Sequence, residues 1–312
     1  MENRSIAIKT NNLTKIFGAI KAVDALNIEI NHREVFSLLG RNGAGKTTTI
    51  KMLCCLLMPS SGSAEIMGYD IRRSPLEIKR IIGVSPQETA IAGHLTTKEN
   101  LLLIGGVFGL KRTLSFERAK NLMELMELED RKDQAQRLSG GLQRRLNIAM
   151  ALMSEPQILF LDEPTLGLDP HSRKSVWNYI NKLKREKTIL LTTHYLEEAD
   201  SLADHIAIIH KAQIITSGTS AELKHKHTSI QSLKITADNI SSDIIEGLQN
   251  SGMEVVTSTN CLVISSADLD FYPIINYLQT KDIRIKGIQM QEPTLEEVFL
   301  QLTGEEVKNE SN

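Results

Sequence analysis

A glycine-rich segment with one lysine and one threonine carries the strongest chemical signal in the sequence. Residues 40–47 read Gly-Arg-Asn-Gly-Ala-Gly-Lys-Thr, which matches the phosphate-binding pattern G-x-x-x-x-G-K-[ST]. The N–H groups of such a loop can cradle phosphate oxygens, and the following helix points its positive end at them. Lys46 would add a full charge at the β- and γ-phosphates, and the Thr47 hydroxyl would bind Mg²⁺. Nucleotide binding is therefore predicted for Gly40, Asn42, Gly43, Ala44, Gly45, Lys46, Thr47 and Thr48.

Two carboxylates follow an apolar run further along the chain. The run is Ile158–Leu161, and Asp162 and Glu163 come directly after it. Asp162 is predicted to hold Mg²⁺ through water, and Glu163 to act as a general base on an attacking water. An Asp-Glu pair alone is weak evidence, but together with a phosphate-binding loop it indicates hydrolysis of a nucleoside triphosphate.

A short glycine turn before these carboxylates narrows the family. Leu138-Ser139-Gly140-Gly141 resembles the LSGGQ signature of ABC ATPases, whereas the phosphate loop alone would also fit kinases, GTPases or RecA-like motors. The resemblance implies that Ser139, Gly140 and Gly141 contact ATP bound to a second subunit. Leu142 stands where the family usually has glutamine. The expected contacts come from the Ser139 hydroxyl and the Gly141 N–H, so we expect hydrolysis to be intact and any contact of the glutamine side chain to be lost.

Four single residues resemble further positions of this family, in the family's order. Phe17 resembles the aromatic residue that stacks on adenine, and Gln87 the glutamine that touches Mg²⁺ and the attacking water. Asp169 resembles the D-loop aspartate, and His194 the switch histidine that contacts the γ-phosphate. Alone, each would more often be a core aromatic, a surface amide, a turn residue or a structural histidine. The resemblance covers about residues 5–220, and implies Glu163, Gln87 and His194 as catalytic residues.

The cofactors that the resemblance implies are ATP and Mg²⁺. The metal ligands that it implies are Thr47, Gln87 and Asp162.

The elements that must position these residues indicate an α/β fold. Four continuous apolar runs separated by helical stretches predict a parallel sheet buried on both faces; they are Val35–Leu39, Ile158–Leu161, Thr188–Thr193 and Ile206–Ile209. Alternating apolar residues over Asp24–Asn31 predict a half-buried strand. The family implies a RecA-like core with an N-terminal antiparallel β subdomain. A helical subdomain is predicted over about residues 97–154, opened by a capping box from Thr96 to Glu99.

A second, smaller domain is predicted after the ATPase domain of residues 1–226. The basic segment Lys224–His227 is interpreted as a linker. Residues 228–304 then follow the order β-α-β-β-α-β, which is ferredoxin-like. The predicted elements are strands 230–235, 254–257, 261–265 and 283–289 and helices at about 242–250 and 271–280.

The end of the chain also resembles a subgroup of the family. Pro293 and Thr294 open a last helix that ends near Gly304, and residues 305–312 are predicted to be a disordered tail. Residues 292–304 resemble the ending of ATPase subunits from ABC-2-type exporters, which include the daunorubicin-resistance and sodium-extrusion groups.

Composition excludes several other classes of protein. The chain has 312 residues with 36 Lys+Arg and 38 Asp+Glu, and this charge balance argues against nucleic acid as a partner. The three cysteines, Cys54, Cys55 and Cys261, lack metal-site or disulfide spacing and fit a reducing cytosol. The longest apolar run, Leu101–Leu110, is shorter than the about 20 residues of a spanning helix. The N-terminus shows no signal peptide.

The resemblance implies two kinds of partner. The chain has one set of motifs, so we expect a head-to-tail homodimer that sandwiches two ATP·Mg²⁺, although a different ATPase partner stays open. We also expect a separate ABC-2-type permease that holds the chain at the cytoplasmic face of the membrane and exports a cargo. The sequence leaves that cargo open, and residues 228–304 could stabilise the dimer, regulate it or contact the permease.

Three alternatives were weighed against a transporter subunit. DNA-maintenance ATPases of this superfamily insert long coiled coils between their two nucleotide-binding motifs. In this chain the corresponding residues, Lys46 and Asp162, are only 116 positions apart, with no sustained heptads between them. ABC-F ribosome factors normally carry two ATPase domains, and this chain has one. A regulatory protein without turnover is disfavoured because Glu163, Gln87 and His194 are all present.

Overall fold

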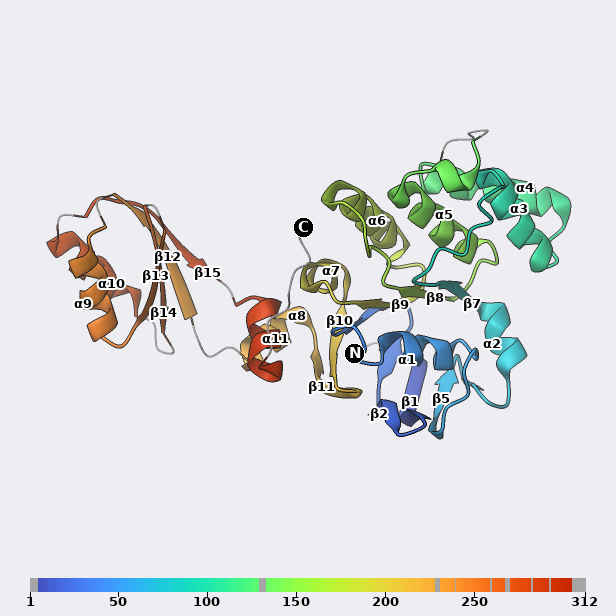
Figure 1. Ribbon diagram of the computed structural model, residues 1–312, viewed down its shortest axis with the longest axis horizontal. Coiled ribbons are helices and arrows are strands. Elements are labelled where there is room, and N and C mark those ends of the chain that lie inside the picture. The colour runs from blue at the N-terminus through green and yellow to red at the C-terminus, as the bar shows by residue number, and fades with distance from the viewer. Residues whose placement is uncertain are drawn as a thin grey trace. The chain divides into compact units, whose positions relative to one another are not determined.

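The computed structural model describes residues 5–128, 133–227, 231–238, 240–258, 260–266, 270–281, 283–291 and 293–304 (Figure 1). The chain divides into two compact units between Ser220 and Ala221. The predicted linker at Lys224–His227 is wrong, because these residues form the end of helix α8 (Ser220–His227). Basic side chains in a last helical turn interact favourably with the helix dipole, which offsets their poor fit to a core. The predicted tail, 305–312, lies outside the described residues.

A six-stranded sheet forms the centre of the first unit and confirms the predicted parallel sheet. Its order is β11-β10-β4-β9-β8-β7, with β11 antiparallel to β10 and the other pairs parallel. The strands are β4 (Val35–Leu39), β7 (Ile82–Ser85), β8 (Ile158–Asp162), β9 (Thr188–Thr193), β10 (His205–His210) and β11 (Gln213–Gly218). Every residue of β4, β8 and β9 is buried. Phe160 and Leu190 enter one hydrophobic core and Leu161 and Leu191 the other, so both faces are covered.

Helices on the two faces fix the carboxyl edge of this sheet. They include α1 (Lys46–Leu53), α6 (Pro170–Leu183) and α7 (Leu196–Leu202). Helix α6 begins at the N-cap Asp169 with a proline at its first position, and its buried residues include Val176, Tyr179 and Ile180.

The N-terminal residues form an antiparallel sheet, as predicted. It contains β1 (Ile6–Phe17), β2 (Ile20–Leu26), β3 (Glu29–Asn31), β5 (Ser61–Ile66) and β6 (Tyr69–Asp70), and α2 (Pro75–Ile81) follows it. The predicted single strand over Asp24–Asn31 is wrong in its continuity, because β2 ends at Leu26 and β3 begins at Glu29. Ala25 adopts a left-handed φ of 49°, and the register of β1 with β2 shifts near this point. The three apolar residues whose alternation predicted a half-buried strand, Leu26, Ile28 and Ile30, are nevertheless all buried.

In its described residues, 97–128 and 133–154, the predicted helical subdomain has three helices and one short 3₁₀ turn. They are α3 (Thr97–Val107), α4 (Arg112–Leu125), the turn Ala135–Arg137 and α5 (Gly140–Leu152). The capping box is confirmed: Thr96 Oγ1 accepts from the Glu99 N–H at 3.3 Å, and the Thr96 N–H donates to Glu99 Oε2 at 2.8 Å. Helix α5 is mostly buried and packs against β7 and β8, so it joins the helical subdomain to the central sheet.

The second unit has the predicted β-α-β-β-α-β order. Its elements are β12 (Gln231–Ala237), α9 (Ser242–Asn250), β13 (Glu254–Ser258), β14 (Cys261–Ser266), α10 (Phe271–Thr280), β15 (Ile285–Gln291) and α11 (Leu295–Thr303). The antiparallel sheet order β13-β14-β12-β15 is the ferredoxin-like arrangement. Ile283, predicted to open the last strand, instead packs into the core before β15 begins, and Ile230 lies outside the described residues. Across the described parts of both units, no helix is long and apolar enough to cross a membrane.

Candidate active site

The phosphate-binding loop connects β4 to α1 at the carboxyl edge of the central sheet. Gly45 has a left-handed φ of 110°, and a Cβ there would lie 2.3 Å from the carbonyl oxygen of Ala22. A Cβ at Gly40 would lie 2.4 Å from the carbonyl oxygen of Ile209. Both positions therefore require glycine because neighbouring backbone comes too close for any side chain. Lys46 Nζ donates to the carbonyls of Gly40 and Arg41 at 2.6 and 3.2 Å.

A cavity of about 380 Å³ opens beside this loop. Its lining combines a residue of β2, the loop with the start of α1, and residues that follow β7 and β8: Ala22, Asn42, Gly43, Gly45, Lys46, Thr47, Thr48, Gln87 and Glu163. Six of the eight residues predicted from the phosphate-loop motif thus face one space together with two of the three predicted catalytic residues. Gly40 and Ala44, also in the predicted set, are buried within the loop.

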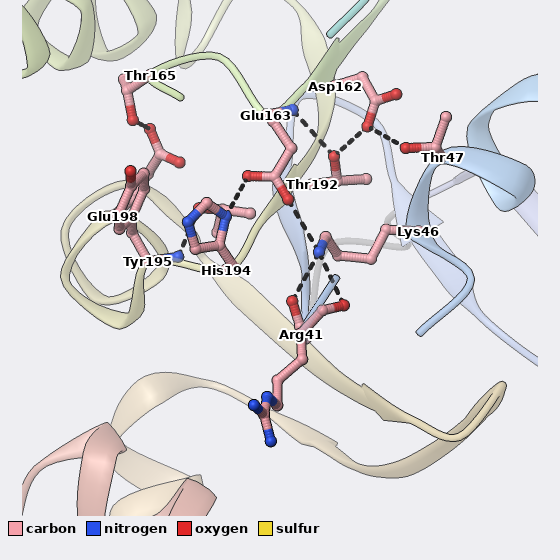
Figure 2. A network of polar contacts seen from close by, with 12 residues as sticks. Arg41, Lys46, Thr47, Asp162, Glu163, Thr165, Thr192, His194, Tyr195 and Glu198 are labelled. Atoms are coloured by element: carbon pink, nitrogen blue, oxygen red, sulfur yellow. Dashed lines mark hydrogen bonds and ion pairs between the residues drawn. The ribbon is translucent and has the colours of Figure 1, made fainter. Parts of the chain in front are cut away.

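Glu163 lies between two basic side chains (Figure 2). Its Oε1 is 2.9 Å from Lys46 Nζ, and its Oε2 is 2.8 Å from His194 Nδ1. Burial, which leaves the side chain 3% exposed, raises the pKa of the Glu163 carboxyl. The His194 hydrogen bond and the Lys46 charge lower it by more, so the pKa is held below its ordinary value. A carboxylate in this setting is ionised at neutral pH and can accept a proton.

Asp162 is held by two threonine hydroxyls, one of which sequence reasoning missed. Thr47 Oγ1 donates to Asp162 Oδ1 at 3.2 Å, and Thr192 Oγ1 donates to the same oxygen at 2.6 Å (Figure 2). The Thr192 hydroxyl also accepts from the Glu163 N–H at 3.0 Å, so it orders both acidic residues. A threonine inside a strand gives no signal of such a role. The Thr47 and Asp162 oxygens are donors of the kind that Mg²⁺ prefers, so this pair fits the ion.

The signature residues lie apart from this cavity. Ser139 is the N-cap of α5 and accepts from the Leu142 N–H at 3.4 Å. Ser139 and Gly140 are exposed, and residues 139–141 are not among the described residues that line the cavity. Gly141 is buried against α6, where an added Cβ would lie 2.7 Å from Ser172 Oγ. Leu142 is half-buried and packs into the second hydrophobic core, which accounts for an apolar residue at this position.

Asp169 and Phe17, like Asp162 and His194, also lie outside the cavity lining. Asp169 caps α6 by accepting from the N–H groups of His171 and Ser172, each at 3.0 Å, and the Ser172 bonds hold its carboxyl pKa below the ordinary value. Phe17 is the last residue of β1 and is 47% exposed. The centroid of its ring lies 5.0 Å from Lys15 Nζ. Its open ring leaves a face on which a planar base could stack.

Comparison with known proteins places this geometry among ATP-binding cassettes. The sequence profile described as ABC transporter matches residues 23–166. The daunorubicin/doxorubicin resistance ATP-binding protein DrrA of Streptomyces peucetius is 37% identical, over 96% of this chain and 92% of that protein. The linearmycin resistance ATP-binding protein LnrL of Bacillus subtilis is 33% identical, over 97% of this chain and all 100% of that protein.

Solved structures give the same result for about 70% of the chain. A dimeric ATP-binding cassette in a post-hydrolysis state, bound to ADP and phosphate, matches with a TM-score of 0.62 and 27% identity, covering 68% of this chain and 98% of that one. A nucleotide-free cassette from an ABC transporter matches with a TM-score of 0.65 and 27% identity, covering 71% and 94%.

Proposed function

The chain belongs to the ATP-binding proteins of ABC transporters, in the drug-resistance exporter group, and we propose that it hydrolyses ATP with Glu163 as the general base. The observation that carries this assignment is the buried pair Lys46 and Glu163, which line one cavity with their charged atoms 2.9 Å apart, together with His194 Nδ1 at 2.8 Å from the Glu163 carboxylate. We assign the ATPase activity to residues 1–226 and an accessory role to residues 228–304.

Substrate binding follows from the residues around the cavity. The N–H groups of the loop and the N-terminus of α1 would hold the phosphate chain, and Phe17 would stack on the adenine. Lys46 would exchange the Glu163 carboxylate for phosphate oxygens when ATP enters. Thr47, Asp162 and Gln87 would hold Mg²⁺, which supplies neutralising charge at the phosphate oxygens.

Proton transfer would use the two groups that already contact each other. Glu163 is ionised because its pKa is lowered, so it can take the proton of a water that attacks the γ-phosphate. His194 directs Nδ1 at Glu163, which leaves Nε2 on the opposite side of the ring for a γ-phosphate oxygen. Gln87 lines the same cavity and would orient the attacking water.

A second copy of the chain would complete the site. Ser139 and Gly140 are exposed at the N-terminus of α5, a helix end suited to phosphate, but they lie outside the lining of their own cavity. The similar cassette described above is dimeric. We infer a head-to-tail homodimer in which Ser139 and Gly141 of each chain reach the ATP held by its partner, with Asp169 near the shared boundary. ATP then bridges the chains, and hydrolysis releases them.

Transport would require a separate membrane protein. The similar proteins are resistance ATP-binding proteins, and the described residues contain no membrane-spanning helix. We propose an ABC-2-type permease as the partner, with the ATPase held at the cytoplasmic face of the membrane. The loop from Gln87 to Thr97, between the cavity and the helical subdomain, would receive the permease, and closure of the ATPase dimer would drive export.

The test is Glu163→Gln in the purified full chain. We expect the rate of ATP hydrolysis to fall at least about a hundredfold, because the amide cannot accept a proton. ATP binding and an ATP-dependent dimer, measured by light scattering, should persist. Lys46→Ala should instead weaken ATP binding, and Glu124→Gln on the exposed surface of α4 is the matched control. Full turnover in Glu163→Gln would show that Glu163 is not the base.

A further inference from the structure

Arg144 on α5 is a buried arginine whose bonding the proposed mechanism does not use. Its side chain is 4% exposed. The guanidinium donates only to backbone carbonyl oxygens: Nε to Pro164 at 2.7 Å, Nη1 to Pro86 at 2.7 Å and Gln87 at 3.2 Å, and Nη2 to Asp162 at 2.8 Å and to Glu163. A guanidinium has five N–H donors in a rigid plane, and here five carbonyls accept from it.

These five carbonyls belong to the two segments that carry Gln87 and Glu163. Pro86 and Gln87 follow β7, Asp162 ends β8, and Glu163 and Pro164 follow it. Helix α5, which carries Arg144, begins at the signature residues 139–141. One planar group therefore connects the signature helix with both catalytic segments of the same chain. Because the guanidinium is flat and rigid, it fixes the separation of the segments as well as satisfying their carbonyls.

Among the residues that the structure describes, no carboxylate group contacts the Arg144 guanidinium directly. Burial lowers the pKa of the guanidinium, while Glu198, Asp162 and Glu163 favour its charged form from a distance. A buried cation held by carbonyls is costly to replace, because an apolar side chain would remove five hydrogen bonds at once. Two of these carbonyls would keep another donor, since the Asn147 amide donates to Pro86 at 3.3 Å and the Leu166 N–H to Glu163 at 3.2 Å. A lysine would keep the charge but offers three donors on a flexible stem, so it cannot reproduce the fork.

We propose that Arg144 is a positioning residue that transmits contact at the signature residues to Glu163 and Gln87 of the same chain. This inference rests on the proposed function, in which Ser139 and Gly141 touch the partner's ATP. A shift of α5 on such contact moves the guanidinium, and with it the backbone that carries Glu163 and Gln87. The two ATP sites of a dimer then communicate through Arg144 in each chain.

The experiment compares Arg144→Lys with Arg145→Lys in the purified full chain. Arg145 is the matched control: it is the next residue of α5, and its guanidinium contacts the Met126 carbonyl at 3.1 Å and the Tyr179 hydroxyl at 3.2 Å, away from the cavity. Four quantities are measured for each: the melting temperature, the affinity for ATP, kcat and KM of hydrolysis, and the Hill coefficient for ATP. Arg144→Met is measured as well, so that loss of the charge and all five donors can be compared with Arg144→Lys, which keeps the charge.

A positioning role predicts a specific split between these quantities. Arg144→Lys should keep the ATP affinity and KM within about twofold, lower kcat at least about tenfold and reduce the Hill coefficient toward one. Arg145→Lys should keep both kcat and the Hill coefficient. Arg144→Met should lose more activity than Arg144→Lys if it folds, and failure of Arg144→Met to fold leaves the test on Arg144→Lys.

Two results would overturn the proposal. One is an Arg144→Lys enzyme with wild-type kcat and cooperativity, and the other is an equal loss in Arg144→Lys and Arg145→Lys, which indicates a structural role only. The proposed function is tested apart from this, because Glu163→Gln addresses the base in chains that retain Arg144. Wild-type behaviour of Arg144→Lys therefore leaves the Glu163 assignment standing.

Discussion

The buried contact between Lys46 and Glu163 predicts an asymmetry in stability that can be measured without nucleotide. The two side chains are 5% and 3% exposed and their charged atoms are 2.9 Å apart. Lys46→Met leaves the Glu163 carboxylate buried with His194 as its remaining partner. Removing one member of a buried ion pair costs about 3–5 kcal/mol, so we expect a loss of that size in the free energy of unfolding.

Glu163→Gln should lower the free energy of unfolding much less than Lys46→Met does. Lys46 keeps two carbonyl acceptors, Gly40 at 2.6 Å and Arg41 at 3.2 Å, so its ammonium stays hydrogen-bonded. We expect about 1 kcal/mol for this variant. In the double variant no buried carboxylate is left without a cationic partner. Its loss in free energy of unfolding should therefore be smaller than the sum of the two single losses by about 1–3 kcal/mol.

Urea unfolding followed by tryptophan fluorescence measures these differences. The chain has one tryptophan, Trp177, which lies on α6 in the first unit and donates from its indole to Glu198 at 3.0 Å. The signal therefore reports on the unit that contains the site. Lys120→Met, at an exposed lysine of α4, is the control and should stay within about 0.5 kcal/mol of the wild type. Additive costs, or a larger cost for Glu163→Gln than for Lys46→Met, would refute the reasoning.

Two further predictions concern the pH dependence of stability and the role of the phosphate-loop glycines in ATP binding. Because the folded pKa of Glu163 is depressed, its stabilising effect is present above the ordinary value of 4.5 and is lost as pH falls through the folded pKa. The difference in free energy of unfolding between wild type and Glu163→Gln should therefore be constant near pH 6 and change progressively as the pH falls below 4.5. A difference that stays unchanged down to the pH at which the wild type unfolds would count against this. Gly45→Ala should weaken ATP binding at least about tenfold for two reasons. The added Cβ would clash with the Ala22 carbonyl oxygen, and alanine is strained at the positive φ of this position. Gly43→Ala, where φ is 82° but the space is open, should lose less in the same fluorescent-nucleotide titration.

The sequence could predict the elements and residues whose signals are local. The apolar runs gave β4, β8 and β9 because strands buried on both faces have no polar positions to interrupt them. Gln87 was predicted from the family resemblance and Glu163 from its place after an apolar run. The fold explains why both lie near the phosphate loop, because β7, β8 and β4 run parallel and their carboxyl ends meet at one edge. The break between β2 and β3 could not be predicted, because it depends on a left-handed Ala25, which alanine rarely adopts.

Thr192 and Arg144 show which contributions lie beyond local patterns. The role of Thr192 depends on β9 lying beside β8, which puts its hydroxyl within reach of Asp162 and the Glu163 backbone; the strand sequence itself is ordinary. Arg144 did carry a usable signal, since it lies three residues after the buried Gly141 and four before the buried Ile148, on one helical face. A charged residue on an apolar face must find partners inside the protein. The sequence could predict that Arg144 has buried acceptors, but only the fold shows that they are the carbonyls behind the catalytic residues.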